Sequence, residues 1–116
     1  MQSFSSDGVK IAFIDMAPTS DVPKHRTVVL VHGFASSHVI NWVNTQWTKT
    51  LTHAGYRVVA LDDRGHGESE KLYDKTAYER DKLAADVIAL MDHLENGRAD
   101  LLGYSMGSRV SLAATV

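Results

Sequence analysis

The sequence contains no cysteine, so disulfide bonds and thiolate metal sites are excluded. Only two prolines occur among its 116 residues, and both lie in "APTSDVPKH" (17–25), which predicts a loop. Charge of neither sign is in large excess, since 12 Lys and Arg stand against 14 Asp and Glu. The basic footprint of a nucleic-acid-binding protein is therefore missing, and we expect no nucleic-acid partner.

Long hydrophobic runs are also absent. No apolar stretch approaches the ~20 residues of a membrane-spanning helix. The opening "MQSFSSDGVKIAF" lacks the basic segment followed by an apolar segment that marks a secretory signal. We therefore expect no membrane partner and a cytoplasmic protein. A hydrophobic content of 44% is ordinary for a globular core, and residues 1–116 show no internal domain boundary.

What is present is an alternation of strand and helix patterns. Continuous β-branched runs predict strands that are covered on both faces, and apolar residues three or four apart predict helices. The predicted strands are 9–14 (near a sheet edge, after the turn signal Asp7-Gly8), 27–31, 57–61 and 99–104. The predicted helices are about 41–54 with Trp47 in the core, about 78–96 closed by Asn96-Gly97, and one that begins at 106. This order predicts an α/β fold with a mostly parallel sheet and helices on both faces.

Three unusual loops follow three of the buried strands. They are "HGF" (32–34), "DDRGHGES" (62–69) and "GYSMGS" (103–108). Ligands of open parallel sheets bind outside the carboxyl ends of the strands. We therefore expect these loops to meet at one edge of the sheet and to form a site there.

The third loop contains Gly103-Tyr104-Ser105-Met106-Gly107, a G-x-S-x-G pattern between a predicted strand and a predicted helix. At average glycine and serine usage, such a match is expected only ~0.04 times by chance in a chain of this length. A strand that turns sharply into a helix strains its corner residue and needs small neighbours on either side. The alternative is an ordinary strand–helix turn that happens to contain a serine.

Together, "LVHGFASS", "VVALDDRGHGES" and "ADLLGYSMGS" resemble successive landmarks of the α/β-hydrolase family, in its serine-nucleophile branch. The family's sheet has the strand order 1-2-4-3-5-6-7-8, so the resemblance covers an N-terminal half, with about five strands and three helices. It implies that Ser105 is the nucleophile and that the backbone amides of Phe34 and Met106 form the oxyanion hole. His32 would support the oxyanion loop, and Gly33, Gly103 and Gly107 would permit close approach.

Two other interpretations of these residues are less favoured. Asp62, Asp63 and His66 could suggest a metal cluster, but a hard-cation site needs more converging groups. The resemblance implies instead that this loop is ordered by internal hydrogen bonds and salt bridges. No nucleotide-binding glycine motif is present, and we expect neither a metal nor a cofactor.

The sequence offers no general base for Ser105. No histidine follows it, and the family places the acid and then the histidine after the nucleophile. We therefore expect both to lie outside this chain, and the 116 residues alone to be inactive. The strand 99–104 would then expose an edge for self-association or for a complementing chain.

The resulting expectation is an esterase-like enzyme that transfers the acyl group of a small-molecule ester or acyl substrate to water. Haloperoxidase-like chemistry and C–C bond hydrolysis remain compatible with the sequence. Ser105 argues against the dehalogenase and epoxide hydrolase branches, which use aspartate at that position. The alternative from another class is a non-catalytic α/β-hydrolase-fold scaffold that binds a ligand or a partner.

Overall fold

The computed structural model describes residues 1–24, 26–95 and 97–115 and contains a five-stranded sheet in the order β1-β2-β4-β3-β5. The strands are β1 (Gln2–Ser6), β2 (Val9–Met16), β3 (Thr27–Val31), β4 (Arg57–Leu61) and β5 (Asp100–Gly103). β3 pairs in parallel with β4 and β5, whereas β2 pairs antiparallel with β1 and β4. The sheet is therefore mixed, and its order is the one that the family resemblance implies.

The antiparallel part begins with a tight hairpin. Asp7 and Gly8, between β1 and β2, have φ values of 49° and 83°. Positive φ at both turn residues is what a type I′ two-residue hairpin requires, so the turn signal in the sequence is confirmed. β1 forms the sheet edge outside β2, which is longer than the predicted strand 9–14.

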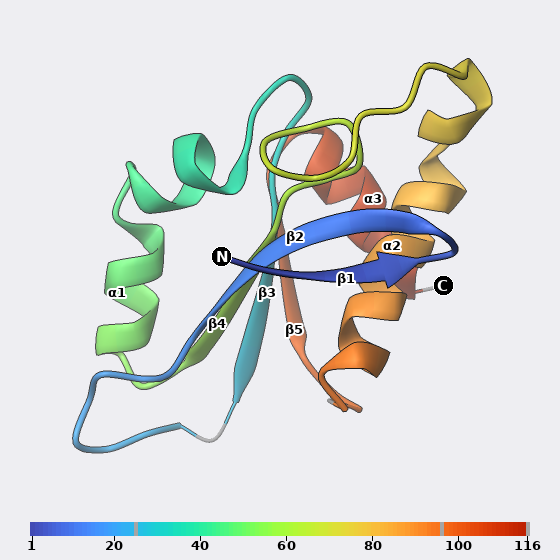
Figure 1. Ribbon diagram of the computed structural model, residues 1–116. Coiled ribbons are helices and arrows are strands. Elements are labelled where there is room, and N and C mark those ends of the chain that lie inside the picture. Colours follow the sequence, from blue (N-terminus) through green and yellow to red (C-terminus); the bar gives the residue numbers. More distant parts are fainter. Residues whose placement is uncertain (25, 96, 116) are drawn as a thin grey trace.

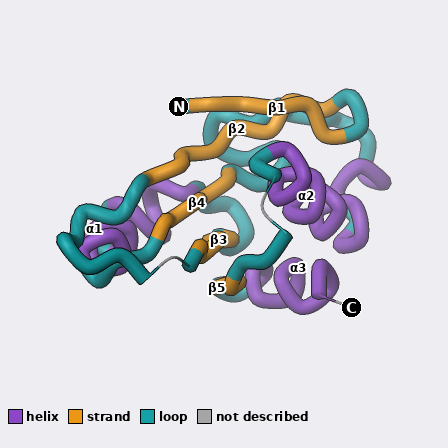
Figure 2. Tube along the Cα trace, turned by 90° about the horizontal axis from the view of Figure 1, so that it is seen from below, coloured by secondary structure: helices purple, strands orange, loops and turns teal. Residues whose placement is uncertain are grey.

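Helices cover both faces of the sheet, as predicted (Figure 1). α1 (Trp47–His53) lies on one face, and α2 (Arg80–His93) and α3 (Met106–Thr115) pack side by side on the other, as the view from below also shows (Figure 2). Two apolar clusters fill the two interfaces, and β3 contributes alternate residues to each of them. The predicted stripe of α2 is buried at Leu83, Val87 and Leu90. Asn96, the expected end of this helix, lies outside the described residues.

The predicted helix over 41–54 is wrong in its first half. A π-helical turn η1 (Val39–Val43) comes first, and Gln46, with a φ of 73°, separates it from α1. This break directs Trp42 into the core, where it is 4% exposed, and leaves Trp47 46% exposed. Trp47 is therefore not a core residue; the buried face of α1 carries Thr48 and Thr52 instead.

The long polar connection after β4 is ordered, and it contains a short 3-10 helix, η2 (Lys75–Tyr78). None of the helices within the described ranges is both long enough and apolar enough to cross a membrane.

Candidate active site

Ser105 occupies the corner between β5 and α3. Its φ of 57° lies in the left-handed region, where a residue with a Cβ is strained by roughly 1–3 kcal/mol. The corner is closed by two backbone hydrogen bonds: the Tyr104 N–H donates to the Val31 carbonyl (3.1 Å), and the Gly107 N–H donates to the Tyr104 carbonyl (2.9 Å). The exposed serine is thus held in a strained position at the carboxyl edge of the sheet.

The two glycines of the motif are sterically required at this corner. A Cβ on Gly103 would overlap the Gly107 carbonyl, and a Cβ on Gly107 would overlap the carbonyls of Val31 and His32. Both obstacles are backbone atoms, which cannot rotate away as a side chain can. The G-x-S-x-G spacing therefore has a direct packing explanation.

The "HGF" turn lies against this corner. A Cβ on Gly33 would stand 3.2 Å from the Tyr104 carbonyl oxygen and 3.4 Å from the Ser105 Cβ. The Phe34 side chain, by contrast, is 75% exposed. The structure thus brings Ser105 and the Gly33–Phe34 peptide to the same edge of the sheet, as the parallel topology predicts.

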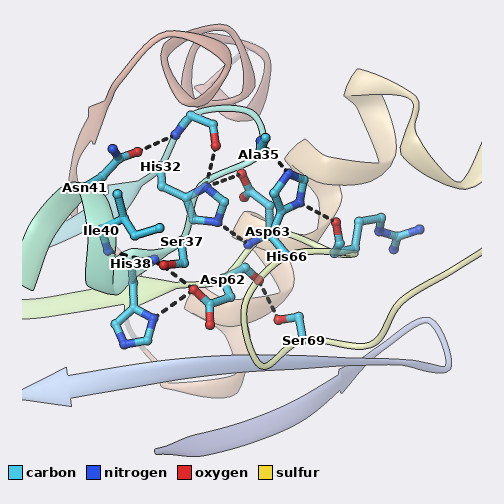
Figure 3. Close-up of polar contacts among 12 residues, drawn as sticks. His32, Ala35, Ser37, His38, Ile40, Asn41, Asp62, Asp63, His66 and Ser69 are labelled. Atoms are coloured by element: carbon cyan, nitrogen blue, oxygen red, sulfur yellow. Dashed lines mark hydrogen bonds and ion pairs between the residues drawn. The ribbon is translucent and has the colours of Figure 1, made fainter.

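Three hydrogen bonds hold the backbone on either side of Phe34 (Figure 3). The Gly33 N–H donates to the Asn41 Oδ1 (2.8 Å), the His32 Nδ1–H donates to the Gly33 carbonyl (2.7 Å), and the Ala35 N–H donates to the His66 Nε2 (3.0 Å). Within the described ranges, the Phe34 N–H itself makes no hydrogen bond. The polar backbone groups of Gly33 and the Ala35 N–H are therefore hydrogen-bonded, and the Phe34 N–H remains free to donate.

The Met106 N–H is a second unpaired donor among the described residues. Met106 is the first residue of α3, and the first amides of a helix have no partner within the helix. They also carry the positive end of the helix dipole, which favours an anion nearby.

His32 has a structural role in the turn. It is 0% exposed, and burial lowers the pKa of its imidazole, which keeps the ring neutral. Its Nδ1–H donates to the Gly33 carbonyl, and its Nε2 accepts from the Asp63 N–H (2.9 Å). Since both ring nitrogens are used, His32 supports the loop and is not available as a base.

Asp63 lies next to this ring as a neutral acid. Burial, together with the nearby carboxylates of Asp86 and Asp62, raises its pKa to about 8. Its Oδ2 is 3.6 Å from the His32 Nδ1, beyond hydrogen-bonding distance, and has no hydrogen-bond partner in the part of the chain that the structure describes. The two side chains are therefore a neutral contact pair rather than a salt bridge.

Asp62 orders the backbone of its own loop. Its carboxylate accepts hydrogen bonds from the His38 N–H (2.8 Å), the His38 Nδ1 (2.8 Å) and the Glu68 N–H (2.9 Å). Burial alone would raise its pKa, but these hydrogen bonds outweigh burial and lower it. Across residues 1–24, 26–95 and 97–115 no cluster of three metal-ligating side chains exists. The contacts of Asp62 therefore give it a structural role in this loop.

Two contacts of the turn were not predictable from the sequence. Asn41 and His66 each bind a backbone amide of the 33–35 turn, and His66 does so across 31 positions in the chain. Sequence patterns report periodicity and motifs, and neither signal identifies a side chain that binds a distant amide. In the sequence, only the glycines on either side of His66 indicated that its loop has a defined conformation.

No general base for Ser105 is found among the described residues. The Ser105 hydroxyl makes no hydrogen bond there. Both ring nitrogens of His32 and of His66 bind backbone groups, and the His38 Nδ1 binds Asp62. The Ser105 hydroxyl is thus exposed and, within the described residues, has no hydrogen-bonded base beside it.

Comparison with known proteins gives the same fold. The family model described as "alpha/beta hydrolase fold" matches residues 26–116. The chain is 44% identical over 85 residues to a dihydrolipoyllysine-residue acetyltransferase component of an acetoin cleaving system from Pseudomonas putida, covering 73% of this chain and 21% of that protein. It is 40% identical over 103 residues to a non-heme chloroperoxidase from Streptomyces lividans, covering 89% of this chain and 34% of that protein.

The crystal structure of epoxide hydrolase A from Mycobacterium thermoresistibile superimposes with a TM-score of 0.84 at 30% identity, covering 99% of this chain and 34% of that one. The chain thus spans about a third or less of the length of these proteins.

Proposed function

The chain belongs to the α/β-hydrolase fold family, and on that premise we propose that Ser105 is the nucleophile of a serine hydrolase acting on a carboxylic ester or a related acyl compound. One observation carries the proposal: Ser105 stands at a strained corner with its φ at 57°, against the Gly33–Phe34 turn. Strain of this kind persists only where the surrounding structure enforces it, and it is concentrated at functional sites.

In the proposed reaction, the Ser105 Oγ attacks the acyl carbonyl carbon and its proton passes to a base. The carbonyl oxygen becomes an oxyanion, which the N–H groups of Phe34 and Met106 would bind. One such preorganised donor stabilises the transition state by ~3–4 kcal/mol. The alcohol leaves with a proton, and water then releases the acid from the acyl-serine.

The base and the acid that complete this reaction would lie outside these 116 residues. His32 and His66 are ruled out as bases because both nitrogens of each ring are already bound. In the family's chain order, an aspartate or glutamate and then a histidine follow the nucleophile. Other parts of the protein would supply both groups.

The relatives support the assignment of an enzyme class but do not identify a substrate. A chloroperoxidase and an epoxide hydrolase share this fold with the chain, so one fold accommodates several reactions. The assignment to acyl transfer therefore depends on the serine itself, since a hydroxyl at this corner can form an acyl intermediate.

The test is Ser105→Ala in the protein encoded by the complete open reading frame, assayed on a p-nitrophenyl ester. Loss of a triad nucleophile lowers kcat by ~10⁶. Ser3→Ala, which removes an exposed serine on β1, is the matched control and should leave turnover unchanged. Turnover of Ser105→Ala within tenfold of the wild type would contradict the proposal, and a folded but inactive wild type would favour a non-catalytic scaffold.

A further inference from the structure

The ring of His66 connects the 62–69 loop to the turn that carries Phe34. Its Nε2 lies 3.0 Å from the Ala35 N, and its Nδ1 lies 3.0 Å from the Arg64 carbonyl oxygen (Figure 3). Its ring also packs beside the His32 ring, with centroids 5.2 Å apart, and edge-on to the Phe34 ring at 6.0 Å. His66 therefore touches the turn through both polar and apolar contacts.

These two hydrogen bonds define the chemical form of the ring. A backbone amide can only donate and a backbone carbonyl can only accept, so Nε2 must be the acceptor and Nδ1 must carry the proton. His66 is thus the neutral Nδ1–H tautomer. Both ring nitrogens of His66 therefore bind backbone groups, one on the Ala35 N–H and one on the Arg64 carbonyl.

The conformation of the 62–69 loop fixes the position of His66. The glycines on either side of it have positive φ values, 80° at Gly65 and 51° at Gly67. A Cβ on Gly65 would overlap the Tyr78 ring, and a Cβ on Gly67 would overlap the Asp62 carboxylate. The His66 N–H also donates to the Asp63 carbonyl (2.9 Å). The tight packing of this turn therefore holds the His66 ring in the position from which it binds the Ala35 N–H.

The geometry points to His66 as a positioning residue of the oxyanion hole, an inference that rests on the proposed function of Ser105. The Phe34 N–H belongs to the Gly33–Phe34 peptide unit, and the Ala35 N–H belongs to the unit that follows it. His32 binds the Gly33 carbonyl, in the same unit as the Phe34 N–H, and His66 binds the Ala35 N–H in the next unit. Rotation of the Gly33–Phe34 unit would break the contact to His32 and would turn the adjoining unit that His66 holds.

Of the contacts that His32 and His66 make to this turn, the one at Ala35 holds a strained residue, because Ala35 has a φ of 57°. An alanine in this region is strained and returns to negative φ when it is not held. The hydrogen bond to His66 offsets that strain. A donor that is already oriented needs no reorganisation as charge develops on the substrate, which is the basis of catalysis by an oxyanion hole.

Two polar replacements of His66 separate the two hydrogen bonds. In His66→Gln, the side-chain oxygen reaches the position of Nε2 and can accept from the Ala35 N–H. In His66→Asn, the amide reaches only the position of Nδ1, so that the contact to Arg64 is kept and the contact to Ala35 is lost. Both variants are made in the full-length protein, and each is compared with the wild type for its melting temperature.

The first readout is independent of catalysis. Amide hydrogen exchange at Ala35 should be fast in His66→Asn and protected in the wild type and in His66→Gln. The second readout is steady-state hydrolysis of a p-nitrophenyl ester. His66→Asn should lower kcat by about 10- to 100-fold, less than the loss of an oxyanion donor itself, with KM within about threefold, while His66→Gln recovers most of kcat.

The outcomes separate this inference from the proposed function. Ala35 protection that is equal in His66→Asn and the wild type would overturn the inference, as would equal losses of kcat in the two variants. A wild type without Ser105-dependent turnover would overturn the proposed function and the catalytic role of His66 together, and the exchange result would then show only that His66 orders the turn.

Discussion

Gly33 and Ser105 lie against each other across the carboxyl edge of the sheet, so closely that a Cβ on Gly33 would stand 3.4 Å from the Ser105 Cβ. The parallel pairing of β3 with β5 brings the two residues together, because both follow the carboxyl ends of neighbouring strands. The candidate nucleophile and the candidate oxyanion turn are therefore positioned by the sheet itself.

Gly107→Ala tests the packing of the corner. Its Cβ would overlap the backbone carbonyls of Val31 and His32, so we expect a loss of about 1–3 kcal/mol or more in the free energy of unfolding. Gly97→Ala is the matched control, since its Cβ would meet no atom within 4 Å. Urea denaturation of both variants gives the comparison, and equal stabilities would contradict the packing account.

The corner was predictable from sequence because its constraint is local. Gly103, Ser105 and Gly107 are close in the chain, and the residue types follow from the steric demands of a strand–helix turn. The sheet order was predicted from the family resemblance. The burial of β3 and β4 on both faces was predicted from their continuous apolar runs.

The region around α1 was predicted wrongly because periodicity alone does not detect a break in a helix. The apolar spacing that included Trp47 continues through Gln46, whose positive φ ends one helical segment and starts another. The amide-binding roles of Asn41 and His66 were missed for a different reason. Such contacts join residues distant in the sequence and leave no periodic signal.

Asp63 should make stability depend on pH. Its pKa is about 8 in the folded state, against an ordinary value of 3.8, so between these values the unfolded chain has lost the proton that the folded chain keeps. The free energy of unfolding should therefore fall as pH rises from about 4 to about 8, by on the order of a few kcal/mol.

Asp63→Asn mimics the neutral acid and should remove most of the dependence of the free energy of unfolding on pH. The variant should therefore gain stability relative to the wild type at pH 8 and not at pH 4. Asp81→Asn, at a side chain that is 88% exposed, is the control. Thermal melts across this pH range give the result. Parallel wild-type and Asp63→Asn profiles would show that Asp63 is ionised in the folded protein.

The buried pair of Arg64 and Asp86 should be a main support of the 62–69 loop. Two hydrogen bonds of 2.7 and 2.8 Å join them, and their side chains are 7% and 1% exposed. Asp86→Ala leaves the buried Arg64 guanidinium without its carboxylate partner and should cost about 3–5 kcal/mol in the free energy of unfolding.

The comparison is Asp100→Ala, which breaks the exposed pair with Arg26, whose side chains are 50% and 63% exposed. An exposed pair contributes only about 0–1 kcal/mol. Denaturant unfolding of both variants measures the difference, and similar losses would mean that burial of the Arg64–Asp86 pair is not what matters.

The 116-residue chain by itself should associate and should lack esterase activity. Among the described residues, β5 pairs with β3 alone, so its other side presents unpaired backbone groups that can template association. Without a base, the oxyanion donors alone would give at most ~10³–10⁴ over water. Light scattering and an activated-ester assay test both points, and a monomer with Ser105-dependent turnover at ordinary esterase rates would refute them.

Covalent labelling tests whether Ser105 is an activated nucleophile. The full-length protein is treated with a fluorophosphonate, digested, and mapped by mass spectrometry. We expect a single stoichiometric adduct on the peptide that contains Ser105, and none in Ser105→Ala. An unlabelled Ser105 in the folded wild type, or equal labelling of the Ser105→Ala protein, would contradict it.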